Sequence, residues 1–346
     1  MTGAAIAGMG VTFPGPMRQD EVWSGFFERH YNGSRKGLAK RIFENSGVVN
    51  RHGAVNPLIE DASGWSTAKR MGRYLTEALP LGKDAVSSAL DAAGLRPDEI
   101  GLFVVCSCTG YATPGLDILL ARDLGMAPTT QRLFIGHMGC YAALPGLGAA
   151  SDFVSARGRP AVLLCLELTS LHVQPPSEDP QQIVAHALFS DAAAAVVLVP
   201  AGAGQSVAEI AAVTDTATAD HMTWDVTDLG FRMGLSPKVP DVLSIYVADL
   251  VGDLLSRHGL TLADVDGWAV HPGGPRILDV VRDQLALPES ALAESRATLA
   301  EHGNCSSPTV LLIIDALRRR TAGPPRNTVA LAFGPGLTLY GTLLRG

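Results

Sequence analysis

Three residues that lie far apart in the chain, Cys140, His271 and Asn304, have side chains suited to acyl transfer. Cys140 is the centre of the stretch I-G-H-M-G-C-Y-A-A-L-P-G-L at 135–147, between an apolar strand-like segment and a helical pattern that runs to about residue 156. This arrangement places the thiol at a helix N-terminus, where backbone N–H groups and the helix dipole favour a thiolate. Such a thiolate can accept an acyl group, and nearby N–H groups can hold the oxyanion that forms.

The histidine and the asparagine add an imidazole and an amide. His271 begins the turn H-P-G-G-P directly after an expected strand, and this rigid turn would hold the ring beyond the strand end. Asn304 lies in G-N-C-S-S. Taken singly, each has a structural explanation: isolated histidines are often structural, and asparagine is a common helix N-cap. Together with Cys140 they supply a nucleophile, an imidazole and a fixed amide donor.

A hidden repeat explains how these residues can meet. Residues 90–105 read L-D-A-A-G-L-R-P-D-E-I-G-L-F-V-V, and residues 255–270 read L-S-R-H-G-L-T-L-A-D-V-D-G-W-A-V, with the same order of helix end, Gly-Leu, acidic turn and strand. The pairs G-C at Cys140 and G-N at Asn304 recur at nearly the same offset. We therefore predict two duplicated halves, 1–211 with the cysteine and 212–346 with the histidine and asparagine. Helices that begin at Cys140 and Asn304 would then face one cavity, with His271 at a carboxyl edge of a sheet.

The rest of the sequence predicts a layered α/β fold. Apolar runs at 4–11, 101–106, 160–166 and 192–199 predict strands, and the later ones are too continuous to be half exposed. Helical spacing covers 21–30, 35–44, 117–124 and 65–95, the last with a break expected near Pro80. Because helices alternate with buried strands, helical layers should cover the sheet.

Composition narrows the class of protein. The 346 residues are 47% apolar and 18% charged, which allows a large core and a buried subunit interface. The net charge of −7 argues against a nucleic-acid partner, and without a run of 18 apolar residues no membrane span is expected. The N-terminus does not resemble a signal peptide. The five cysteines lack zinc spacing, so we expect free thiols, no metal and a cytoplasmic location.

Five motifs together resemble the type III polyketide synthases, the chalcone-synthase-like condensing enzymes, with a bacterial character. They are G-H-M-G-C-Y-A-A at Cys140, A-L-F-S-D at 187–191, H-P-G-G-P at His271, G-N-C-S-S at Asn304 and F-G-P-G-L-T at 333–338. The resemblance extends over most of the chain. It implies the thiolase-like αβαβα fold, a homodimer, and coenzyme A thioesters as substrates with no other cofactor.

The resemblance also implies a mechanism. Cys140 would take a starter acyl group from acyl-CoA, and His271 and Asn304 would donate hydrogen bonds to the malonyl thioester oxygen. These bonds would stabilise the enolate left by decarboxylation, and the enolate would attack the acyl group on Cys140. Repeated extension and cyclisation would complete the polyketide.

Position by position, the resemblance nominates further residues. Phe189 and Phe231 match the two phenylalanines between the CoA tunnel and the inner cavity, and Cys108 and Ser306 match cavity positions. Thr113 matches a residue that reaches across the dimer into the partner's cavity, and His172 replaces a small pocket residue. For the CoA phosphates the candidates are Arg41, which matches the family, and Arg276, which follows H-P-G-G-P. One departure is Ala332, where the family has the first glycine of its G-F-G-P-G loop.

Three other functions remain open at this point. A ketoacyl-carrier-protein synthase of the fatty-acid-initiating type shares the fold and the same three residue types, although it usually has H-Q-A-N in place of H-P-G-G-P. A papain-like hydrolase has Cys, His and Asn in this order, but its cysteine lies near the mature N-terminus. A non-catalytic partner of a condensing enzyme would usually lack the cysteine.

Overall fold

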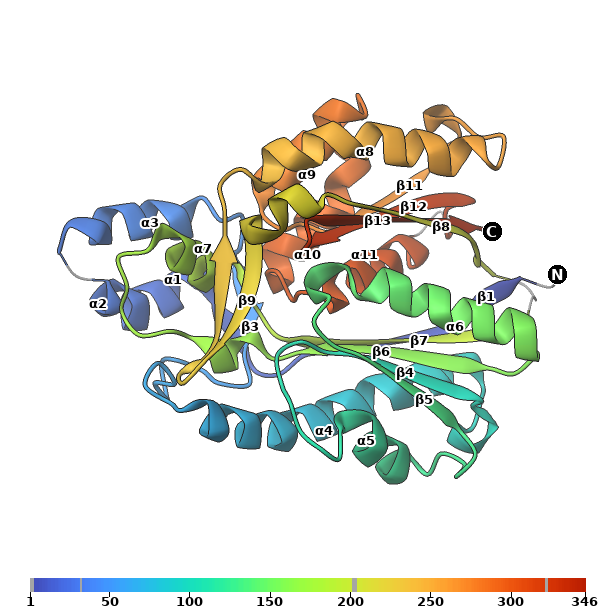
Figure 1. The fold of residues 1–346 in the computed structure, drawn as a ribbon, viewed down its shortest axis with the longest axis horizontal. Helices are drawn as coiled ribbons and strands as arrows, with labels where there is room; N and C mark the ends of the chain where they lie inside the picture. The colour runs from blue at the N-terminus through green and yellow to red at the C-terminus, as the bar shows by residue number, and fades with distance from the viewer. Residues whose placement is uncertain (1–2, 32, 201–203, 321–322) are drawn as a thin grey trace.

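The computed structural model describes residues 3–31, 33–200, 204–320 and 323–346, which form five alternating layers of helices and strands (Figure 1). In the view of Figure 1, α4 (Thr67–Ala93) and α5 (Leu116–Leu124) lie below one part of the sheet, and α8 (Val239–Ser256) and α9 (Pro275–Gln284) lie above the other. Between the two parts run α6 (Ala143–Arg157) and α11 (Pro308–Arg318). This is the αβαβα arrangement that the sequence resemblance implied.

Within the described residues, nine strands form one sheet in the order β11-β12-β13-β8-β1-β7-β6-β4-β5. Their bounds are β1 Ala4–Thr12, β4 Leu102–Cys106, β5 Gln131–Ile135, β6 Ala161–Glu167, β7 Ala192–Pro200, β8 Ser206–Thr214, β11 Gly267–Val270, β12 Asn327–Gly334 and β13 Thr338–Arg345. Two two-stranded sheets stand apart from it: β2 (Pro16–Arg18) pairs with β3 (Asn50–His52), and β9 (Met222–Thr227) forms a hairpin with β10 (Gly230–Leu235). The remaining α-helices of the described residues are α1 Gln19–Val22, α2 Glu28–His30, α3 Lys36–Glu44, α7 Pro180–Leu188 and α10 Ala293–His302.

The strand pairing repeats across the sheet. β4 and β6 are parallel, β6 pairs antiparallel with β7, and β7 pairs antiparallel with β1. In the other part, β11 and β12 are parallel, β12 pairs antiparallel with β13, and β13 pairs antiparallel with β8. The central helices α6 and α11 occupy corresponding places between these strands. A division at residue 211 stays a prediction, and that residue lies inside β8.

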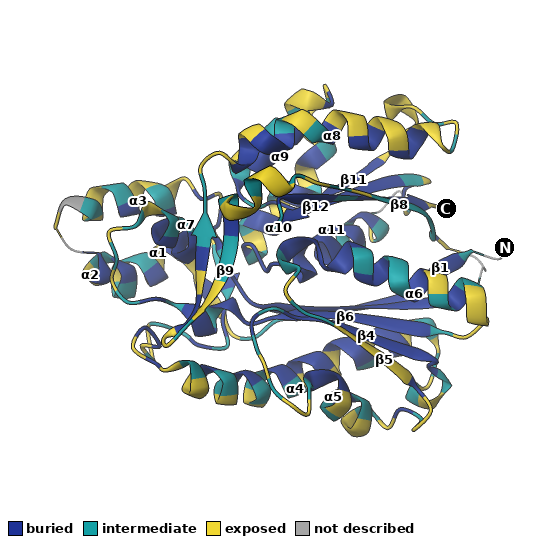
Figure 2. Cartoon of the chain, viewed as in Figure 1, coloured by how far each residue is buried: buried dark blue, intermediate teal, exposed yellow. Residues whose placement is uncertain are grey.

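Side-chain size decides how closely the layers approach. Strands β6, β7 and β12 and helix α11 are largely buried, whereas α6 is buried mainly on one face (Figure 2). In β1, a Cβ atom at Gly10 would lie 2.2 Å from the carbonyl oxygen of Ala85, and one at Gly8 would lie 2.2 Å from that of Ala89. Glycine at both positions therefore lets the backbone of α4 lie directly on β1.

One local expectation was wrong. Helix α4 runs unbroken through Pro80 for 27 residues, because its apolar face is buried against the sheet and offsets the single hydrogen bond that proline removes. The segment 21–30 is helical but includes a five-residue π-helical stretch at Trp23–Phe27. In contrast to the buried strands, β5 is an edge strand whose first four residues are exposed.

None of the helices in the described ranges combines the length and apolar character needed to cross a bilayer.

Candidate active site

Cys140, His271 and Asn304 line one cavity of about 610 Å³. Its other walls come from α3, α7, the β10–α8 connection and the first turn of α9, so it begins at the molecular surface and ends at the central layer. The three residues reach it from different elements: Cys140 from the turn before α6, His271 from the end of β11, and Asn304 from the link between α10 and α11. The convergence predicted from the repeat is therefore present in the structure.

Cys140 lies in a 3₁₀ turn, Gly139–Tyr141, that leads directly into α6. Its side chain is buried, and burial raises the pKa of the Cys140 thiol to about 12, although hydrogen bonding to Ser306 and to its own backbone N–H acts in the opposite direction. The sequence predicted that the helix end would favour a thiolate; here desolvation outweighs that effect. The resting group is therefore a thiol that must lose its proton as it reacts.

His271 directly follows β11, where its backbone N–H donates a hydrogen bond of 2.8 Å to the carbonyl oxygen of Leu331. The imidazole is 1% exposed, and neither Nδ1 nor Nε2 has a hydrogen-bond partner among the described residues. Burial lowers the pKa of His271 to about 3, so the ring is neutral at ordinary pH. A neutral imidazole with free nitrogens can donate one hydrogen bond and accept one proton.

Asn304 is fixed by both its backbone and its side chain. Its N–H donates to the carbonyl oxygen of Leu188 at 2.8 Å, and its own carbonyl accepts from the N–H of Ser190 at 2.9 Å. Its Oδ1 accepts from the N–H of Ser306 at 2.8 Å, so the Nδ2 group is the part of the amide left to act as a donor in the cavity. Because α11 begins at Pro308 with Ser307 before it, Asn304 is not the helix cap.

Gly303 makes this placement possible. Its φ of +71° and ψ of −172° belong to a region essentially restricted to glycine. A Cβ atom there would lie 2.9 Å from Cβ of Ser190 and 3.1 Å from the carbonyl oxygen of Leu188. Glycine therefore allows the chain to turn toward the segment that holds Asn304.

A buried carboxyl group beside Cys108 was missed by the sequence reasoning. Glu167, at the end of β6, accepts hydrogen bonds from Thr109 Oγ1 at 2.7 Å and from the backbone N–H of Cys108 at 3.0 Å. Ser307 Oγ also donates to it at 3.0 Å. Burial raises the pKa of Glu167 to about 7, and its negative charge raises the pKa of Cys140. The available signal was a glutamate ending an otherwise apolar strand, L-L-C-L-E.

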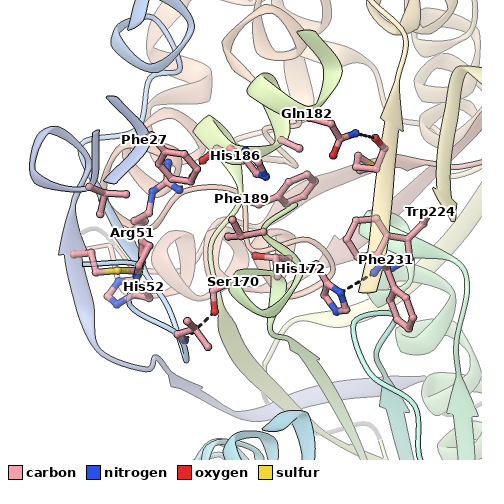
Figure 3. A pocket seen from close by; sticks show the side chains of 18 residues that line it. Phe27, Arg51, His52, Ser170, His172, Gln182, His186, Phe189, Trp224 and Phe231 are labelled. Atoms are coloured by element: carbon pink, nitrogen blue, oxygen red, sulfur yellow. Dashed lines mark hydrogen bonds between the residues drawn. The ribbon is translucent and has the colours of Figure 1, made fainter. Parts of the chain in front are cut away.

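The nominated pocket residues divide between two cavities. Phe189 lines the large cavity and also a chamber of about 50 Å³, whereas Phe231 and His172 line only the chamber (Figure 3). Cys108 and Ser306 are absent from the described residues that line either cavity, but both contact the Cys140 region through side-chain interactions. Thr113 is exposed.

The two nominated arginines lie in the outer part of the large cavity. Arg41 is exposed on α3, and Arg276 is at the start of α9. Arg276 Nη2 lies 3.2 Å from the Asp241 carboxylate. Ala332 lies inside β12, paired with Tyr340, so the chain at that position is extended and does not require glycine.

Comparison with known proteins agrees with this geometry. Residues 40–203 match the N-terminal domain of chalcone and stilbene synthases, and residues 208–346 match the C-terminal domain. The chain is 36% identical to 1,3,6,8-tetrahydroxynaphthalene synthase of Streptomyces peucetius subsp. caesius, over 90% of this chain and 85% of that protein. It is 30% identical to alpha-pyrone synthesis polyketide synthase-like Pks18 of Mycobacterium tuberculosis, over 88% of this chain and 81% of that protein.

The fold is also similar to that of a solved polyketide synthase. The crystal structure of PKS-I from the brown alga Ectocarpus siliculosus superposes with a TM-score of 0.92 and 31% identity, covering 100% of this chain and 99% of that one. With family matches to both halves and a shared fold, this chain belongs to the chalcone and stilbene synthase family and is a type III polyketide synthase.

Proposed function

We propose that this enzyme loads an acyl group from acyl-CoA onto Cys140, extends it with malonyl-CoA by iterative decarboxylative condensation, and cyclises the product. The observation that carries the proposal is that the Cys140 thiol, the His271 imidazole and the Asn304 amide line one cavity open to the surface. In the acylation step, sulfur attacks the thioester carbonyl and CoA leaves as a thiol. Because the thiol pKa is raised, its proton has to pass to a base, and the neutral His271 ring in the same cavity is the candidate.

The second step needs hydrogen-bond donors for an enolate. His271 and the Asn304 Nδ2 group would donate to the malonyl thioester oxygen, which gains negative charge as carbon dioxide leaves. The enolate carbon then attacks the acyl carbonyl on Cys140 and the sulfur is released. Buried donors are effective here because they are already oriented and the site excludes much of the competing water.

The inner chamber is the proposed compartment for the acyl chain. Phe189 separates it from the large cavity, since this residue lines both, and Phe231 forms part of its far wall. Cys108 and Ser306 would border the same region from the Cys140 side. Phe189 would therefore decide which acyl groups pass from the CoA side.

The outer cavity is the proposed site of the CoA arm. Arg41 and Arg276 would pair with its phosphates, because guanidinium groups form strong charge-assisted hydrogen bonds with them. Arg276 would exchange its surface pairing with Asp241 for a phosphate.

We propose that CoA thioesters suffice and that no metal or other cofactor takes part; activity should then survive dialysis against a chelator.

We also propose a homodimer, joined at the edge strand β5. Leu133 and Phe134 on this strand are 39% and 41% exposed, and unpaired edges are commonly covered in stable proteins. Thr113 is exposed in the single chain and would reach the partner's cavity. Light scattering should give twice the chain mass, and Leu133→Lys should shift it toward the monomer; a monomeric wild-type protein would contradict the proposal.

The five free cysteines suit a reducing, cytoplasmic location.

Labelled malonyl-CoA with short, long and aromatic acyl-CoA starters provides the direct test. We expect extended, cyclised products from free CoA thioesters, with labelled carbon dioxide released. Activity that depends on an acyl carrier protein would indicate a ketoacyl synthase instead, because that class takes malonyl units from the carrier. Peptide cleavage, or no turnover at all, would overturn the proposal in favour of the other two alternatives.

A further inference from the structure

A pair of histidine rings lies just outside the segment that holds Asn304. His52 is the last residue of β3, and His302 is the last residue of α10, two positions before Asn304. Nε2 of His52 lies 3.1 Å from Nδ1 of His302, and Phe13 stacks on both rings with centroid distances of 4.3 Å. His302 is absent from the described residues that line either cavity, so an effect of this residue on the reaction has to pass through its neighbours.

The two rings can form one well-defined hydrogen bond. The carbonyl oxygen of Pro14 lies 3.3 Å from Nδ1 of His52, and because a carbonyl can only accept, the His52 proton is assigned to Nδ1. Nε2 of His52 is then an acceptor for the N–H at Nδ1 of His302. Burial lowers the pKa of His52 to about 4 and also lowers the pKa of His302. Both rings are therefore neutral at ordinary pH, and one donor meets one acceptor.

The backbone of His52 connects the pair with the chain on the other side of Asn304. The hydroxyl of Ser190 accepts a hydrogen bond of 2.8 Å from the His52 N–H and donates one of 3.2 Å to the His52 carbonyl oxygen. That carbonyl also accepts from the N–H of Asp191 at 3.1 Å. Ser190 in turn donates its own N–H to the Asn304 carbonyl oxygen. The contacts thus form a closed chain that leaves Asn304 through Ser190 and returns to it through His302.

Gly303 has no side chain that could fix its own position in this closed chain. It is the single residue between His302 and Asn304, and its backbone adopts a conformation essentially restricted to glycine. The end of α10 must therefore be held by other contacts. A backbone hydrogen bond of 2.8 Å from the N–H of Val49 to the carbonyl oxygen of Ala300 is one of them. The histidine pair is another, and it acts at the residue next to Gly303.

We propose that His52 and His302 are positioning residues for the decarboxylation step: their hydrogen bond holds the end of α10 against β3 and thereby keeps the Asn304 amide in the orientation that the enolate requires. The inference rests on the proposed function, in which Asn304 donates to that enolate. A displacement of about 1 Å in a group that acts on the reaction can cost about 10²-fold in rate. Cys140 lies on a different element, the turn before α6, so its reactivity should not depend on the histidine pair.

The test uses His302→Phe, which keeps a ring against Phe13 but removes the hydrogen bond, and His302→Asn, whose Nδ2 group can take the place of Nδ1. Release of labelled carbon dioxide from malonyl-CoA alone gives kcat and KM for decarboxylation. One neutral hydrogen bond changes an equilibrium by about two- to tenfold. We therefore expect His302→Phe to lower kcat by about three- to tenfold, with KM for malonyl-CoA within about twofold, and His302→Asn to recover most of that loss.

Two further measurements separate positioning from a general loss of structure. In an Asn304→Ala background, His302→Phe should change decarboxylation by less than about twofold, because the group that it positions is gone. Alkylation of Cys140 by iodoacetamide should keep its rate within about twofold in His302→Phe, because an independent site is not affected. The matched control is His258→Phe: this half-buried histidine follows α8, lies 3.5 Å from the Glu209 carboxylate, and should leave kcat unchanged.

Several results would overturn the inference. They are an unchanged kcat in folded His302→Phe, an equal loss of decarboxylation and of Cys140 alkylation, no recovery in His302→Asn, and an equal loss in the Asn304→Ala background. If His302→Phe does not fold, His52→Phe replaces it, since the hydrogen bonds from residue 52 to Ser190 are made by its backbone. An Asn304→Ala enzyme that decarboxylates like the wild type would instead contradict the proposed function.

Discussion

Replacing Asn304 by aspartate tests the proposed enolate stabilisation with a minimal change. The Oδ1 position keeps its hydrogen bond from the Ser306 N–H, and the backbone bonds to Leu188 and Ser190 do not involve the side chain. Only the Nδ2 group changes, from a donor to an oxygen that is an acceptor when ionised. Asn304→Asp should therefore remove the proposed function of the amide while leaving its surroundings in place.

The expected fall in the decarboxylation rate has two causes. Loss of one oxyanion donor usually lowers turnover by about 10²–10³, or about 2.7–4 kcal/mol. A negative charge about 4 Å from the enolate oxygen would oppose it by up to about 4 kcal/mol at an effective dielectric constant near 20. Protonation of the aspartate would relieve the second effect. We therefore expect decarboxylation to fall by about 10²–10³ in Asn304→Ala and by at least about 10³ in Asn304→Asp.

Release of labelled carbon dioxide from carboxyl-labelled malonyl-CoA measures this step. The substitutions are made in a Cys140→Ala background, so that condensation does not contribute, and urea unfolding shows whether each variant is folded. If a folded Asn304→Asp enzyme decarboxylates within about threefold of its parent, the amide does not hold the enolate, since a lost donor costs far more.

Three further predictions follow from the geometry. Cys140→Ala should abolish the acyl-enzyme seen by intact-protein mass spectrometry while carbon dioxide release stays measurable; an acylated variant would remove Cys140 from its role. Glu167→Gln removes a negative charge that raises the pKa of Cys140. Iodoacetamide should therefore alkylate Cys140 roughly three- to tenfold faster at pH 8, and the pH profile of the alkylation rate should move toward lower pH. An unmoved profile would contradict this coupling between Glu167 and Cys140. Gly303→Ala should lower the free energy of unfolding by about 1–3 kcal/mol in urea titrations, because its backbone conformation is essentially restricted to glycine; unchanged stability would show that the turn relaxes.

Much of the fold was accessible from the sequence because strong periodicity and a repeat determine it. The continuous apolar runs became buried strands, and the repeat placed Cys140 and Asn304 at corresponding helix starts. The Pro80 expectation was wrong because a local rule competed with burial of a long apolar face. Local propensity is a weak guide where tertiary packing supplies most of the stability.

The parts of the site that could not be predicted depend on burial and on contacts between distant segments. A helix start favours a thiolate, yet the degree of desolvation around Cys140 appears only when the surrounding layers are assembled. Glu167 is one glutamate among many in the sequence, and its importance comes from three donors that meet at its carboxylate. His172 was nominated as a pocket residue, but the structure shows both of its nitrogens engaged with backbone groups.

Two backbone hydrogen bonds connect the proposed acyl gate, Phe189, with the proposed enolate donor, Asn304. Asn304 bonds to Leu188 and Ser190 on either side of Phe189, so the gate and the amide share one short stretch of chain. A displacement of this stretch would move both together. Changes in starter size caused by substitution of Phe189 should therefore be accompanied by changes in the rate of malonyl-CoA decarboxylation.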